Sequence, residues 1–121
     1  MIIEILDCEF SICKVKDYSK VDPDAEFTFV AKTNEENSLV CPTVEIPSNT
    51  VERNDGWRAF RIRGILDFSL IGILSSISKI LADNQIGIFV ISTFNTDYIL
   101  IKTENISKAV DALSNAGYTL E

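Results

Sequence analysis

The chain has 121 residues, which is enough for one ordinary domain or two very small ones. Hydrophobic residues make up 46% and charged residues 24%, so long disorder is not expected. The net charge of −7 works against nucleic acid and anionic membrane surfaces as partners. The sequence has no apolar stretch of membrane-spanning length and no basic region typical of a secretion signal, so we expect a cytoplasmic protein.

The first half of the sequence predicts strands joined by turns. Strands are expected at residues 2–6, 10–16, 27–33 and 39–41. The polar segment 34–37 is a turn between the last two of these strands, and Pro42 ends the second of them. Residues 47–56 are mostly polar and predict a connector, so we place the boundary between the two halves after residue 55.

The second half opens with a predicted strand at 57–63, followed by an amphipathic helix from about Leu70 to Asn84. Six apolar residues fall on one face of this helix: Leu70, Ile73, Leu74, Ile77, Ile80 and Leu81. Asp67 or Ser69 supplies a side-chain oxygen for the helix start, and Asn84 is expected as its left-handed stop.

Two further strands, 88–93 and 98–102, predict a hairpin whose turn lies at 94–97. A second helix begins near Ile106, with Thr103 or Asn105 as its cap, and Gly117 closes it. A short strand over 118–121 ends the chain.

The predicted order over residues 56–121 is strand, helix, strand, strand, helix, strand. This is the βαββαβ order of a ferredoxin-like α+β fold, an antiparallel sheet with two helices on one face. Residues 1–55 resemble an abbreviated copy of this unit, which suggests two tandem halves.

Arg58, Arg61 and Arg63 form the one tight basic group of the sequence. They alternate with apolar residues on a predicted strand, so we interpret them as a solvated strand face rather than a nucleic-acid site.

Several motifs resemble a known family of small ACT-domain proteins. Residues 67–74, D-F-S-L-I-G-I-L, are similar to its D-F-S-L-T-G-I-L segment, and residues 91–100 are similar to its I-S-T-F-x-T-D-Y-x-L segment. Leu39-Val40-Cys41-Pro42 and Gly56-Trp57-Arg58 match further short stretches of that family.

This resemblance implies two ACT-like halves, the first degenerate, as in proteins related to the regulatory part of aspartate kinases and to arginine sensors. It also implies an allosteric, regulatory module that binds a free amino acid at the helix-opening loop and the hairpin tip. Ile71 stands where the family often has threonine, which puts the identity of the ligand in doubt.

The chemistry of an amino acid suits these two segments. Its carboxylate fits the free backbone N–H groups at the helix start, where Gly72 allows close approach, and its ammonium fits the carboxylate of Asp97. The candidate ligand-binding residues are Asp67, Ser69, Leu70, Ile71, Gly72, Thr93, Phe94, Asn95, Thr96 and Asp97. Each also has a plain structural explanation, because Asp67 and Ser69 are good helix caps and Asp97 is a good turn residue.

Two other classes of function compete with a sensor. An enzyme is disfavoured because the chain has no histidine, and Cys8, Cys13 and Cys41 lack the spacing of a metal site or the partner of a nucleophile. We therefore predict no catalytic residue, no metal site and no cofactor. A protein-interaction module without a ligand is the stronger rival, and we expect a homodimer in either case.

Overall fold

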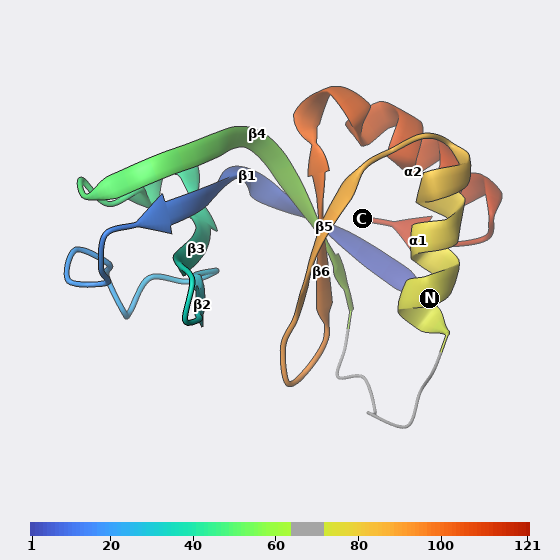
Figure 1. Cartoon of the computed structure of the whole chain (residues 1–121). Coiled ribbons are helices and arrows are strands. Elements are labelled where there is room, and N and C mark those ends of the chain that lie inside the picture. The colour runs from blue at the N-terminus through green and yellow to red at the C-terminus, as the bar shows by residue number, and fades with distance from the viewer. Residues whose placement is uncertain (64–71) are drawn as a thin grey trace. The chain divides into compact units, whose positions relative to one another are not determined.

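The structure, a computed structural model, describes residues 1–63 and 72–121 (Figure 1). The chain forms two compact units: unit 1 is Met1–Asp7 with Arg58–Glu121, and unit 2 is Cys8–Trp57. Strands β1 (Ile2–Val15) and β4 (Thr50–Ile62) each contribute residues to both units. The expected halves, 1–55 and 56–121, remain a prediction about ACT-like repeats. The compact units differ from them because the first seven residues group with the second half of the chain.

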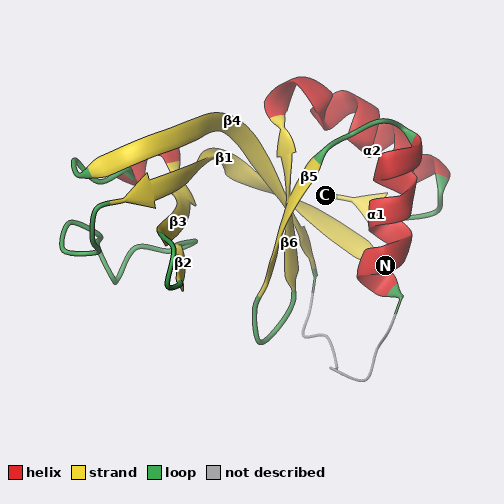
Figure 2. Cartoon of the chain, in the orientation of Figure 1, coloured by secondary structure: helices red, strands yellow, loops and turns green. Residues whose placement is uncertain are grey.

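Unit 1 is an α+β arrangement of a largely antiparallel sheet and two helices (Figure 2). Its strands are neighbours in the order β7-β1-β4-β6-β5. The elements not yet placed are α1 (Ile73–Asp83), β5 (Ile88–Ser92), β6 (Asp97–Lys102), α2 (Ile106–Asn115) and β7 (Thr119–Leu120). The β5–β6 pair is antiparallel, whereas β7 runs parallel to β1. The predicted unit of residues 56–121 does not include β1. The parallel pairing of β1 with β7 was therefore not predicted.

The core of unit 1 lies between the helices and one face of this sheet. Helix α1 buries Ile77 and Leu81, and α2 buries Ala109 and Leu113, which the helical spacing predicted. The same cluster includes Ile3 of β1, which is 1% exposed. The first strand of the chain therefore completes the core of unit 1.

Both helices end in a left-handed residue with the hydrogen bonds of a Schellman motif. In α2 this residue is Gly117, as predicted, and the next amide, Tyr118 N–H, donates to the carbonyl of Leu113 at 3.1 Å. In α1 the prediction of Asn84 is wrong, because Gln85 has the positive φ of 61° while Asn84 has a φ of −98°. Glutamine has no side-chain preference for this conformation, so the sequence did not mark the position.

The start of α1 also differs from the prediction. The helix begins at Ile73, and Gly72 is its N-cap with a φ of 85° and no side-chain hydrogen bond. Gly72 is therefore outside the helix, not in its first turn, and neither Asp67 nor Ser69 occupies the N-cap. Both of those residues lie outside the described part of the chain, as do Leu70 and Ile71. In α2, Asn105 is the N-cap as predicted, but its side chain makes no capping hydrogen bond.

Unit 2 holds strands in the order β2-β3-β1-β4, with β2 at Phe29–Lys32 and β3 at Asn37–Pro42. Its residues 8–57 are all described and contain no α-helix, only the 3-10 turn η1 (Thr43–Glu45). The predicted connector at 47–56 is wrong, because residues 50–57 belong to β4. The two predicted strands at 2–6 and 10–16 are one continuous strand, β1. Polar and charged residues are tolerated in this part of β4 because none of residues 50–57 is buried.

The hairpins of the two units share one register at a constant spacing of 60 residues. Phe29 pairs with Val40 in unit 2, and Phe89 pairs with Leu100 in unit 1. Each hairpin is followed at once by a 3-10 turn, η1 in unit 2 and η2 (Thr103–Asn105) in unit 1. Only in unit 1 does an α-helix continue from that turn.

We expect the two helix ends to respond in opposite ways to substitution. Gln85→Gly should raise the free energy of unfolding by about 1 kcal/mol, because glycine adopts a positive φ without the steric cost borne by other residues. Gly117→Ala should lower it by about 1 kcal/mol through the backbone alone, since no atom lies within 4 Å of an added Cβ. Denaturant unfolding measures both, and Gln85→Ala is the control that should change little. A loss of stability in Gln85→Gly would contradict the assignment.

Candidate ligand-binding site

The described residues of the predicted site lie on two segments at one end of unit 1. Gly72 precedes α1, and residues 93–97 form the turn between β5 and β6. Figure 1 shows this turn and the first turn of α1 at the same end of the unit. Asp67, Ser69, Leu70 and Ile71 lie outside the described residues, so their part in the site remains a prediction.

The turn is closed by hydrogen bonds between its two threonines. The Thr93 amide and hydroxyl both donate to the Thr96 carbonyl, at 2.9 and 3.0 Å. At the base of the turn, the Ser92 hydroxyl donates to Asp97 Oδ1 at 2.5 Å. The Asp97 carboxylate therefore already has one partner within the hairpin and keeps further acceptor capacity.

Thr96 connects this turn to the end of β4. Its side chain is buried, at 6% exposure, and its hydroxyl donates to the carbonyl of Ile62 at 2.8 Å. Ile62 is the last residue of β4, the strand that leads toward α1. The bond therefore fixes the hairpin tip beside the point where the chain leaves β4. The Thr96 hydroxyl, a candidate ligand-binding group, therefore already donates its hydrogen bond to the protein.

The tip of the turn is open to solvent. Phe94 is 78% exposed and Asn95 is also exposed. A single exposed aromatic ring is common on protein surfaces, so Phe94 alone does not define a contact surface.

A hollow of about 340 Å³ opens at the start of α1. It is lined by Met1, Gly72, Ile73, Ser76 and Tyr118. None of the residues of the β5–β6 turn lines it. Gly72 and the turn therefore share an end of the unit, but the described residues do not bring them into one pocket.

Arg58 and Arg61 of β4, and Arg63 directly after it, are held by acceptors of unit 1. Arg58 donates to the carbonyl of Leu6 at 2.8 Å, and Arg61 Nη2 lies 3.2 Å from Glu4 Oε2. Arg63 pairs with Glu4 at 3.5 Å and also with Glu121. The hydrogen bond from Arg61 is the main reason that the pKa of Glu4 is below its usual value. Arg61 and Arg63 are thus paired with carboxylates, whereas the acceptor of Arg58 is an uncharged carbonyl. That this group is no nucleic-acid site remains a prediction.

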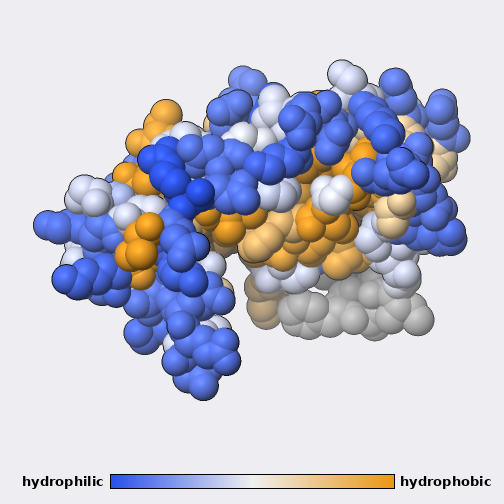
Figure 3. All heavy atoms as spheres, turned by 45° about the horizontal axis from the view of Figure 1, so that its top comes forward, coloured by the Kyte–Doolittle hydropathy of each residue, from blue (hydrophilic) through white to orange (hydrophobic). Residues whose placement is uncertain are grey.

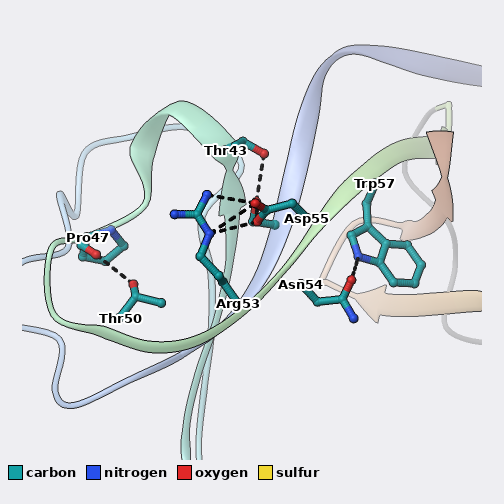
Figure 4. Close-up of polar contacts among 8 residues, drawn as sticks. Thr43, Pro47, Thr50, Arg53, Asn54, Asp55 and Trp57 are labelled. Carbon is teal, nitrogen blue, oxygen red and sulfur yellow. Dashed lines mark hydrogen bonds and ion pairs between the residues drawn. The ribbon is translucent and has the colours of Figure 1, made fainter.

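Sequence reasoning missed a polar cluster in unit 2 (Figure 4). The buried Ser11 hydroxyl donates to Asp55 Oδ1 at 2.7 Å and lies 2.9 Å from the Thr43 hydroxyl. Arg53 Nη2 approaches Asp55 Oδ2 at 2.9 Å. Arg53 and Asp55 carry opposite charges at positions i and i+2, the spacing that places two side chains on one face of a strand. This spacing was not interpreted as a pair because the segment was predicted to be a connector. The polar side chains of this cluster are therefore hydrogen-bonded to one another.

Two of the three cysteines, Cys13 and Cys41, lie in the interior of unit 2, whereas Cys8 is only partly buried. Cys13 and Cys41 are buried at 4% and 1% exposure. Burial raises the pKa of both, that of Cys41 to about 12. Both are therefore neutral thiols near pH 7 and poor nucleophiles. Among the described residues, no group of three or more histidine, cysteine or acidic side chains could hold a metal ion.

A family model described as ACT domain matches residues 52–115. The chain belongs to the ACT-domain family. No curated protein sequence matches it. Within the part of the chain that the structure describes, this ACT-domain protein has no helix long and apolar enough to cross a membrane.

Solved structures resemble this ACT-domain protein over nearly its whole length. A protein from Agobacterium tumefaciens is 32% identical, with a TM-score of 0.84 over 99% of this chain and 91% of that one. The regulatory subunit of aspartate kinase from Thermus thermophilus is 11% identical, with a TM-score of 0.64 over 95% and 96%. Aspartate kinase from Clostridium acetobutylicum, named as an allosteric enzyme, is 13% identical, with a TM-score of 0.66 over 93% of this chain and 33% of that one. The two kinase matches show the fold alone.

Loss of the Thr96 hydroxyl should weaken unit 1. Thr96→Val leaves the buried Ile62 carbonyl without its partner, so we expect a decrease of about 1–3 kcal/mol in the free energy of unfolding. Thr96→Ser keeps the hydroxyl and should retain most of this stability. Thr119→Val, at an exposed strand position, is the control for the change of side chain. Equal stability of Thr96→Val and the wild type would show that the bond contributes little.

The thiols should differ in their rates of labelling. At pH 8 the folded protein should expose one quickly reacting thiol, because Cys8 is half-buried whereas Cys13 and Cys41 are buried. With a pKa of about 12, Cys41 is a thiolate in only about one molecule in ten thousand at that pH. An Ellman assay before and after denaturation counts the two classes. Cys8→Ser should abolish the fast class, and rapid labelling of all three thiols in the folded chain would contradict the burial.

Proposed function

We propose that this protein is a non-catalytic regulatory module that binds a free amino acid at the end of unit 1 where α1 begins. The observation that carries this proposal is the buried bond from the Thr96 hydroxyl to the Ile62 carbonyl. This bond holds the hairpin tip, which lies in one of the family's ligand motifs, next to the end of β4. The other motif follows β4 in the sequence.

The chemistry of an amino acid supports this location. The N-terminus of α1 has amide N–H groups in its first turn and a positive dipole end, and its N-cap, Gly72, has no side chain to cap it, which suits a carboxylate. Gly72 has no Cβ, which leaves room for close approach. The Asp97 carboxylate suits the ammonium. Asp67, Ser69, Leu70 and Ile71 remain in the proposed site through the motif that they belong to.

The relatives support a regulatory role without fixing the ligand. One is the regulatory subunit of an aspartate kinase, and another is an aspartate kinase named as allosteric. The buried, neutral thiols of Cys13 and Cys41 also agree with a protein that performs no nucleophilic chemistry.

The tandem arrangement is part of the proposal. Two ACT-like halves, the first abbreviated, account for the constant 60-residue spacing between the paired residues of the two hairpins. They also account for the 3-10 turn that follows each hairpin, η1 in one unit and η2 in the other. A homodimer and a cytoplasmic location belong to the same proposal.

A protein-interaction module without a ligand is the second candidate. It is favoured because two of the candidate ligand-binding side chains already make hydrogen bonds within unit 1. Asp97 accepts the Ser92 hydroxyl, and the Thr96 hydroxyl is used by Ile62.

A thermal-shift screen of the twenty amino acids tests the proposal. A ligand present at 100 times its dissociation constant adds about 2.7 kcal/mol to stability, which should raise the melting temperature by about 10 °C. Asp97→Asn should reduce the shift, because the neutral amide attracts an ammonium less strongly. Calorimetric titration then gives the dissociation constant and the number of sites.

Asp83→Asn is the matched control, since Asp83 is an exposed carboxylate at the other end of α1, paired with Lys79. Its melting-temperature shift should equal that of the wild type. If none of the twenty amino acids changes the melting temperature, the sensor proposal fails and the interaction module is favoured. If a shift survives in Asp97→Asn, the ligand binds but the role assigned to Asp97 is wrong.

A further inference from the structure

Strand pairing brings two cysteines of unit 2 together. Cys13 lies opposite Leu39 in the β1–β3 ladder, and Cys41 lies opposite Ser11. Residues 13 and 41 are therefore diagonal neighbours on one face of the sheet. Burial is the main cause of the raised pKa of Cys41, and the adjacent Cys13 adds to it. The sequence predicted no metal site because these two positions are far apart along the chain.

The surroundings of the two thiols are apolar. Both cysteines belong to the buried cluster of unit 2 with Val15 and Leu39, and the partly buried Ile46 packs against it. On the face shown in Figure 3 the surface of unit 2 is mostly hydrophilic, whereas this cluster is buried. Within residues 1–63 and 72–121, no three histidine, cysteine or acidic side chains form a group that could hold a metal ion. Zinc, which takes four ligands in structural sites, is therefore unsuited to the pair.

A small cavity reaches one of these thiols. It has a volume of about 10 Å³, near the lower limit for a single water molecule. Its lining includes Cys41, Leu39 and two exposed acidic residues, Asp22 and Glu45. A thiol reagent is too large for such a cavity, whereas a bare metal ion fits it. The two acidic residues favour the approach of a cation.

The spacing of the two cysteines suits an ion better than a disulfide. Diagonal neighbours in an antiparallel sheet have Cα atoms about 7–8 Å apart, whereas a disulfide usually joins Cα atoms about 4.4–6.8 Å apart. Both thiols are free in the structure. An ion between two sulfur atoms adds two metal–sulfur bonds of about 2 Å each, and so it spans the wider gap.

We propose that Cys13 and Cys41 bind one soft monovalent metal ion, Cu(I), between their two sulfur atoms. Thiolates are ligands that select Cu(I), and two of them can complete its coordination. Binding releases both thiol protons, because each ligand must be deprotonated, and the resulting unit of one Cu(I) and two thiolates carries one negative charge. The charge of Arg53 interacts with both cysteines and favours this product, although Asp55 also pairs with Arg53.

Anaerobic titration of the full chain with Cu(I), in competition with a coloured Cu(I) chelator, tests the proposal. The wild type should bind one ion per chain. Cys13→Ala and Cys41→Ala should each raise the dissociation constant by about 100-fold or more, since even the outer partners of metal ligands contribute about 10–100-fold. Cys8→Ala is the matched control, because Cys8 is the third free thiol and is only partly buried. It should bind Cu(I) like the wild type, and circular dichroism checks that each variant is folded.

X-ray absorption of the wild type loaded with one equivalent of Cu(I) tests the coordination without any substitution. The spectrum should show two sulfur ligands. A wild type that binds Cu(I) no more tightly than a folded Cys41→Ala variant overturns the proposal, as does a spectrum with nitrogen or oxygen ligands in place of sulfur. Binding of zinc as tight as that of Cu(I) would overturn the two-coordinate site. None of these outcomes depends on amino-acid binding, so this proposal and the sensor proposal can fail separately.

Discussion

Strand β1 is the constraint on which both units depend. Its N-terminal part places Ile3 in the core beneath the two helices of unit 1, and its C-terminal part places Cys13 and Val15 in the core of unit 2. A single strand of 14 residues therefore supplies buried residues to two hydrophobic clusters. Unit 1 is therefore built from two separate stretches of sequence, whereas unit 2 is one continuous stretch, and β1 contributes buried residues to the cores of both.

This constraint explains which parts of the fold the sequence could predict. The helical spacing of Ile77, Leu81, Ala109 and Leu113 is local information, and the structure buries all four. The partner of β1 is not local information, because a strand pattern says which residues face a core but not which core. The division of the chain into 1–55 and 56–121 followed sequence order, whereas the compact units follow strand pairing.

The candidate site was predictable to a similar extent. Turn chemistry predicted a hairpin tip near 94–97, and the tip is there. The Thr96 hydroxyl could not be assigned, because its partner, the Ile62 carbonyl, lies 34 residues away in the sequence. Gly72 was placed inside the helix because its neighbours fit the helical period. Only its φ of 85° reveals that Gly72 is the N-cap, outside the helix.

The two hairpins share a backbone register but differ in the side chains of their turns. This difference bears on which of the two turns could contact an amino acid. The turn of unit 2 carries Glu35 and Glu36 where unit 1 has Asn95 and Thr96. Two carboxylates at the tip repel the carboxylate of an amino acid, so the turn of unit 2 is unsuited to a second copy of the proposed ligand site. Residues 8–57 of unit 2, all of which the structure describes, also form no α-helix. Unit 2 therefore has no equivalent of the start of α1, where the amino acid is proposed to bind in unit 1.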